Sequence, residues 1–208
     1  MATSIDNLSV TGSLTIKDTG VSAQTRASVL KQDANAIFPV TMERLRVWDA
    51  MQTNLPGTAA SDDLALISGT FGTAPSMIQA GDLKAAGATT RYARVQIVLP
   101  ECYDAGETIT LNISAGMKTT IADTSCTLDV EAYKLDKISG IGSDLCATAA
   151  QSINSVTFAT KPFTITASGL VAGDVLDVRI AIACTDAATG TAVTPTIAAI
   201  DLVCDIKG

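Results

Sequence analysis

The chain has 208 residues, a formal net charge of −7 and no histidine. Without histidine it lacks the commonest general base, the Ser–His and Cys–His nucleophile pairs and the usual zinc sites, so the composition disfavours an enzyme. Basic and acidic residues cancel over residues 1–55, which leaves the whole negative charge on the rest of the chain. Because an acidic surface repels phosphate, we expect no nucleic-acid partner.

Hydrophobic residues make up 47% of the chain and aromatic residues only 4%, so Val, Ile, Leu and Ala must fill the core. Those residues suit pleated sheets, and the length suits one all-β domain. The N-terminus has neither a basic start nor an apolar stretch after it, and no segment reaches 18 consecutive apolar residues. We therefore expect neither a secretory signal nor a membrane partner.

Residues 1–57 are predicted to be an extended N-terminal arm, because they hold too little apolar material for a core of their own. Within them, residues 38–51 form an apolar segment that contains the chain's single tryptophan. Apolar side chains outside a regular body need cover, and aromatic anchors are enriched at interfaces. The candidate partner-binding residues of the arm are Leu8, Val10, Leu14, Ile16, Phe38, Leu45, Val47 and Trp48.

Residues 58–208 alternate between apolar and polar positions, most clearly from Thr108 to Met117. This alternation is typical of strands with one buried and one wet face. Eight strands at this spacing predict an antiparallel two-sheet β-sandwich of jelly-roll type, with an immunoglobulin-like Greek key as the alternative. The predicted strands are residues 62–71, 92–99, 107–117, 126–134, 153–159, 163–168, 174–184 and 196–206, and residues 72–90 are predicted to be a loop.

No motif in the sequence predicts a catalytic, cofactor or metal site. The carboxylate pairs Asp62–Asp63 and Asp129/Glu131 lack a calcium-loop pattern and are expected to be solvated. The tyrosines are scattered along the chain and predict no aromatic platform. The five cysteines show no Cys-x-x-Cys spacing, so we expect reduced thiols. Cys126, Cys184 and Cys204 fall on the apolar phase of their strands, where cysteine acts as a small hydrophobe.

Several segments resemble structural proteins of tailed bacteriophages. They are residues 45–50 (LRVWDA), 55–56, 62–64, 87–94, 144–154 and 173–179, and residues 8–15 are similar to short repeats of phage fibre and capsid-associated proteins. The resemblance implies a virion component, with a capsid decoration (cement) protein as the best-fitting role. It further implies a homotrimer that is made in the host cytoplasm, binds the major capsid protein on the capsid surface, and has no catalytic residues.

Three other functions compete with the cement role. A head fibre, neck or tail protein fits the same sequence. A module that binds host glycans is disfavoured, because it needs clustered Trp or Tyr and the one tryptophan lies outside the predicted body. An enzyme ranks last, because the chain offers so few acid–base groups.

Overall fold

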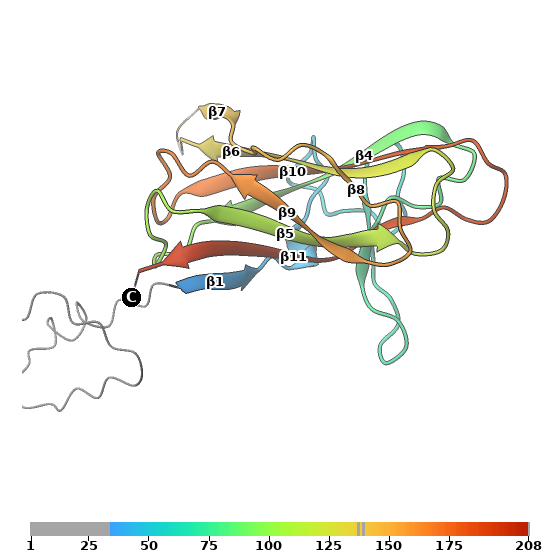
Figure 1. Ribbon diagram of the computed structural model, residues 1–208, viewed down its shortest axis with the longest axis horizontal. Coiled ribbons are helices and arrows are strands. Elements are labelled where there is room, and N and C mark those ends of the chain that lie inside the picture. Colours follow the sequence, from blue (N-terminus) through green and yellow to red (C-terminus); the bar gives the residue numbers. More distant parts are fainter. Residues whose placement is uncertain (1–33, 137, 139, 208) are drawn as a thin grey trace, which may run out of the picture. The chain divides into compact units, whose positions relative to one another are not determined.

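The computed structural model describes residues 34–136, 138 and 140–207. In this part of the chain eleven strands form two antiparallel sheets that pack as a sandwich, as Figure 1 shows. The predicted all-β sandwich is therefore confirmed, and its arrangement is consistent with a jelly-roll-like fold. No helix in the described residues is both long and apolar enough to cross a membrane.

The first sheet has the order β2-β3-β11-β5-β9, and β1 also pairs with β11. β3 and β1 share one edge of β11, where β3 pairs with its start and β1 with its end. The strands are β1 (Ala34–Pro39), β2 (Ala65–Ile67), β3 (Met77–Gln79), β5 (Ile109–Met117), β9 (Ala159–Ile165) and β11 (Pro195–Ile206).

The second sheet has the order β4-β10-β6-β7, and β8 also pairs with β6. β10 lies in its middle and is paired along its length with β4 on one side and β6 on the other. The strands are β4 (Gly87–Val98), β6 (Ser125–Leu135), β7 (Ile141–Asp144), β8 (Gln151–Ser152) and β10 (Val175–Asp186).

The core lies between the sheets and follows the predicted alternation closely. On β10, for example, Leu176, Val178, Ile180 and Ile182 face inward and are buried. Large apolar side chains from both sheets fill the space between them. Their burial removes apolar surface from water, which is the main stabilising contribution to such a sandwich.

The predicted strand at 153–159 is wrong. Ile153 N donates to Cys126 O of β6 at 2.9 Å, and Met117 N of β5 donates to Ser155 O at 2.8 Å. The segment therefore crosses from one sheet to the other instead of running along either. The predicted loop at 72–90 is also wrong in part, since it contains β3 and the start of β4.

Residues 34–57, which the sequence assigned to the arm, belong to the sandwich. β1 pairs with β11, and Val40, Leu45 and Leu55 are buried in the core. Arg46 and Arg94 exchange two backbone hydrogen bonds of 2.8 and 3.0 Å, which cover part of the free edge of β4. Such cover blocks edge-to-edge association. Residues 34–57 thus belong to the same compact unit as the described residues that follow them.

Candidate functional site

The outer face of β4, β10 and β6 carries a cluster of polar and aromatic side chains. The antiparallel register places Arg94, Arg179 and Glu131 in one row across the three strands. Asp177 and Tyr133 lie opposite each other in the next row. Because cross-strand neighbours on one face are close enough to touch, these rows form one continuous surface.

Trp48 reaches this surface from the loop that follows the short 3₁₀ turn Met42–Arg44. Its indole Nε1 donates to Asp62 Oδ2 at 3.0 Å. The ring packs against Tyr92 of β4, with 5.1 Å between centroids and 48° between planes. This tilted geometry is favourable for aromatic pairs. The loop thus adds an aromatic side chain to a sheet face that already carries Tyr92.

Arg179 links the aromatic and the acidic parts of the surface. Its guanidinium carbon lies 5.0 Å from the ring centroid of Tyr92 and 5.5 Å from that of Trp48. Its Nη2 lies 2.6 Å from Glu131 Oε2, and this hydrogen bond raises the pKa of Arg179. Burial, followed by the negative charge of Glu131, raises the pKa of Tyr133.

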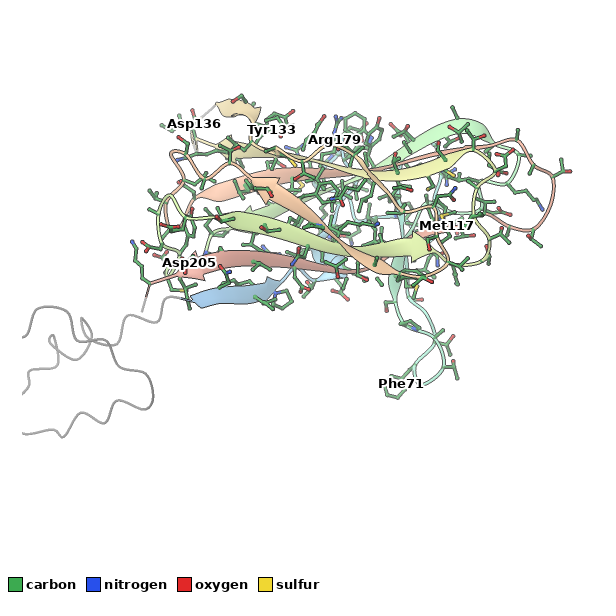
Figure 2. All side chains as sticks on the ribbon, in the orientation of Figure 1. Phe71, Met117, Tyr133, Asp136, Arg179 and Asp205 are labelled. Atoms are coloured by element: carbon green, nitrogen blue, oxygen red, sulfur yellow. The ribbon has the colours of Figure 1, made fainter. Side chains whose placement is uncertain are left out.

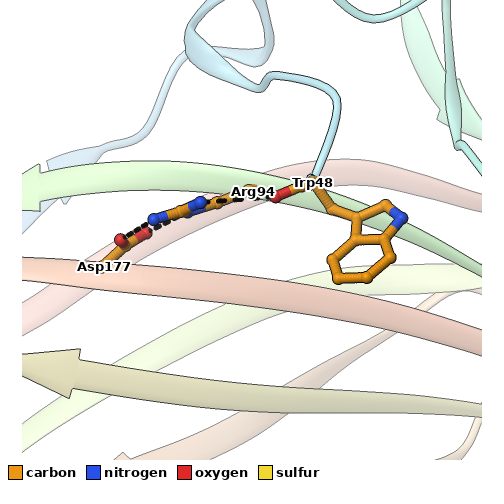
Figure 3. Close-up of polar contacts among 3 residues, drawn as sticks. All are labelled: Trp48, Arg94 and Asp177. Atoms are coloured by element: carbon orange, nitrogen blue, oxygen red, sulfur yellow. Dashed lines mark hydrogen bonds and ion pairs between the residues drawn. The ribbon is translucent and has the colours of Figure 1, made fainter. Parts of the chain in front are cut away.

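Arg94 is fixed by a second ion pair. Its Nε donates to Asp177 Oδ1 at 2.7 Å and its Nη2 donates to Asp177 Oδ2, which makes the pair bidentate. Its Nη1 donates to the Trp48 carbonyl oxygen at 3.4 Å, so one guanidinium connects the loop to β10 (Figure 3). The hydrogen bond with Asp177 raises the pKa of Arg94. These contacts orient the loop that carries the indole.

Two adjoining depressions hollow this face. One, of about 340 Å³, is lined by residues that include Trp48, Arg94, Glu131, Tyr133, Asp177 and Arg179. The other, of about 200 Å³, lies over Ala181 and Ala183 of β10. Both share Glu131 and Arg179, so we refer to them together as the outer groove. The small alanine side chains leave the space that forms the second depression.

A larger hollow of about 510 Å³ lies along the hairpin between β2 and β3. Its lining residues, 68 and 71–76, carry no charged side chain. Phe71 at the hairpin tip is fully exposed, and Figure 2 shows it far from Arg179 and Tyr133. A ligand in this hollow would find few groups to orient it, so we assign the candidate site to the outer groove.

The candidate partner-binding residues of the sequence fall in different places. Leu45 and Val47 are buried in the sandwich, and Phe38 is half-buried against its core. Trp48 lines the outer groove. The remaining four, which lie outside the described residues, are Leu8, Val10, Leu14 and Ile16. In the described part of the chain, no group of three or more His, Cys, Asp or Glu is placed to hold a metal ion.

No protein-family model and no curated protein matches the sequence. Similar solved structures include the xylan-binding module CBM15, with 16% identity, a TM-score of 0.45, and coverage of 82% of this chain and 97% of that one. A family 16 carbohydrate-binding module has 13% identity, a TM-score of 0.38, and coverage of 71% and 88%. The cyclase Fisc from Fischerella sp. TAU has 13% identity, a TM-score of 0.41, and coverage of 83% and 90%.

The expected role as a capsid decoration protein is wrong. The structure removes the physical argument for that role. Leu45 and Val47, two of the residues predicted to bind a capsid partner, are buried within this chain's own sandwich. The resemblance to bacteriophage proteins itself stays a prediction.

Proposed function

We propose that this protein is a non-catalytic carbohydrate-binding module whose ligand lies in the outer groove. The observation that supports this function is the combination, on one partly exposed sheet face, of two aromatic rings in contact and paired charged groups. Trp48 and Tyr92 supply the rings, and Arg179 and Glu131 supply the charges. This was the disfavoured alternative of the sequence analysis.

A sugar ring needs both kinds of group. Its C–H faces pack against the electron-rich face of an aromatic ring, and Trp48 and Tyr92 line the groove. Its hydroxyls donate to carboxylates and accept from guanidinium groups, which Glu131 and Arg179 provide. Since both groups are already held by their ion pair, little side-chain entropy is lost when the ligand binds.

The charge of the groove favours an uncharged glycan. Arg94 and Arg179 are each paired with a carboxylate, and Asp49 and Asp129 add negative charge to the lining. A uronic acid or a sulfated sugar would meet this surplus of negative charge. The two adjoining depressions provide room for more than one sugar unit along the sheet.

Titration calorimetry of the full chain against neutral oligosaccharides tests the proposal. Xylo-oligosaccharides come first, because xylan is the ligand named for one of the similar folds, and cello- and manno-oligosaccharides follow. We expect a neutral glycan to bind and an oligogalacturonate not to bind. Tyr92→Ala should weaken binding about tenfold, which corresponds to about 1.4 kcal/mol.

The matched control is Phe71→Ala, which removes an exposed aromatic ring outside the groove and should leave the affinity unchanged. Circular dichroism establishes that both variants keep the sandwich. The proposal fails if no neutral glycan binds, or if folded Tyr92→Ala binds as tightly as the original chain.

A further inference from the structure

Cys126 and Cys184 face each other on the adjacent strands β6 and β10, near one end of their paired length. They are direct partners in the antiparallel register of β6 and β10. Both side chains point into the core, with exposures of 0% and 2%. Both are thiols in the structure, and the ligand groove lies on the opposite face of the same two strands.

In an antiparallel ladder, facing residues alternate between hydrogen-bonded and non-hydrogen-bonded pairs, and the backbone hydrogen bonds of β6 show which kind Cys126 and Cys184 form. The Cys126 carbonyl accepts a hydrogen bond from Ile153 N. The Ala132 carbonyl, an even number of residues further along β6 and so on the same side of the strand, accepts one from Leu145 N. Both bonds lie on the edge of β6 away from β10. Since the N–H and C=O of one strand residue point to the same side, Cys126 and Cys184 are a non-hydrogen-bonded pair.

Such a pair has the spacing that a disulfide needs. The Cα atoms of a non-hydrogen-bonded pair are about 4.5 Å apart, within the range of about 4.4–6.8 Å that disulfides span. In keeping with this spacing, the interaction between the two thiols raises the pKa of Cys126 and lowers that of Cys184. Little backbone movement is required to join them.

We propose that Cys126 and Cys184 are a disulfide site that cross-links β6 and β10 beneath the outer groove. Thr127 and Ala183, the neighbours of the two cysteines, line the groove. The bond would hold the two strands in register where the ligand lies. This inference stands on strand geometry alone, so it does not depend on the proposed function.

The oxidant is a small-molecule disulfide such as oxidised glutathione. One cysteine thiolate attacks it, forms a mixed disulfide and releases one small thiolate. The second cysteine thiolate then attacks the protein sulfur of the mixed disulfide and releases the other small thiolate. Two protein thiols are oxidised, one small disulfide is reduced to two thiols, and the two protons pass to the released thiolates. Because both cysteines are buried in the folded chain, the exchange takes place before the sheet closes over them.

The test is oxidative refolding of the full chain from denaturant in a mixture of oxidised and reduced glutathione. We expect the intact mass to fall by two hydrogens, and peptide mapping to place the bond between Cys126 and Cys184. The melting temperature should exceed that of the reduced protein by at least about 5 °C, because the bond constrains the unfolded chain.

Cys126→Ala and Cys184→Ala should each lose both the bond and the temperature shift. Cys146→Ser should keep both, because its sulfur contacts the Thr148 carbonyl instead of a cysteine. The inference is overturned if Cys126 and Cys184 are both alkylated as free thiols after oxidative refolding. It is also overturned if either joins another cysteine, or if the mapped bond lowers the melting temperature.

Discussion

Arg94 and Asp177 form a bidentate ion pair between β4 and β10, in which the carboxylate is 3% exposed and the guanidinium 32%. The carboxylate is therefore almost completely removed from water, and Arg94 compensates its charge. The same guanidinium reaches the Trp48 carbonyl oxygen. The pair thus connects the stability of the sheet to the position of the indole in the outer groove.

Arg94→Leu should destabilise the protein by about 1–3 kcal/mol, because it leaves a buried carboxylate without its partner. Arg94→Lys keeps the charge but not the bidentate contact, and should cost less. Urea unfolding measures both. Arg44→Leu is the control, since this exposed arginine donates a long hydrogen bond of 3.3 Å to Gln96 O. A loss no larger for Arg94→Leu than for Arg44→Leu would contradict the account.

Asp63→Asn should stabilise the protein at neutral pH. Burial, and next the charges of Asp62 and Asp49, raise the pKa of Asp63, and its buried Oδ1 has no hydrogen-bond partner among the described residues. A carboxyl whose pKa is higher in the folded state favours folding when protonated, so stability falls as pH rises through that pKa. The difference in melting temperature between Asp63→Asn and the original chain, measured from pH 3 to 7, isolates this contribution. That difference should grow in favour of Asp63→Asn as pH rises, and an equal pH dependence in the two proteins would refute the assignment.

Asp186 should show the opposite pH dependence. Its carboxylate accepts backbone hydrogen bonds from Asp123 N at 2.8 Å and Ala85 N at 3.0 Å, which lower its pKa. A carboxyl whose pKa is lower in the folded state stabilises the fold when ionised. That stability is lost as pH falls from the unfolded pKa, near about 4, through the folded one. Asp186→Asn should lower the melting temperature at pH 7 and reduce the loss on acidification. An unchanged melting temperature at pH 7 would count against this role.

Gly69→Ala should destabilise the β2–β3 hairpin more than Gly72→Ala. Both glycines have positive φ, of 67° and 79°, which costs any other residue about 1–2 kcal/mol. Only at Gly69 would the added Cβ also collide with the Ala74 carbonyl oxygen, whereas Gly72 has open space. Urea unfolding should rank the two variants in that order, and the reverse order would contradict the hairpin geometry.

The main strands could be predicted from the sequence because one face of each is buried. On β10, Leu176 to Ile182 alternate with polar or small residues, and this period locates the strand and its inner face. β7 and β8 could not be predicted in this way, since β7 is exposed along its whole length and β8 has only two residues. The predicted arm, residues 1–57, rests on how little apolar material these residues hold. Its described part, residues 34–57, is instead buried against the edge of β4 and the core, and such long-range contacts leave no periodic pattern in the local sequence.

The candidate site could be predicted only in part. Trp48 was recognised as an anchor, but its cover is Tyr92 and Arg179 of this chain instead of a partner. Glu131 was expected to be solvated, because its neighbour Arg179 is distant in sequence and meets it only through the register of β6 and β10. Periodicity gives the face on which a side chain lies, but not which strands are adjacent.

The most direct test of the carbohydrate-binding proposal uses the fluorescence of Trp48, the chain's single tryptophan. Because this indole lines the outer groove, a glycan bound there changes its environment. We predict a saturable change in emission when a neutral oligosaccharide is titrated into the full chain, with weaker affinity in Tyr92→Ala. A glycan that binds by calorimetry without any change in this emission would show that the ligand lies elsewhere. The absence of binding to every neutral glycan would contradict the function itself.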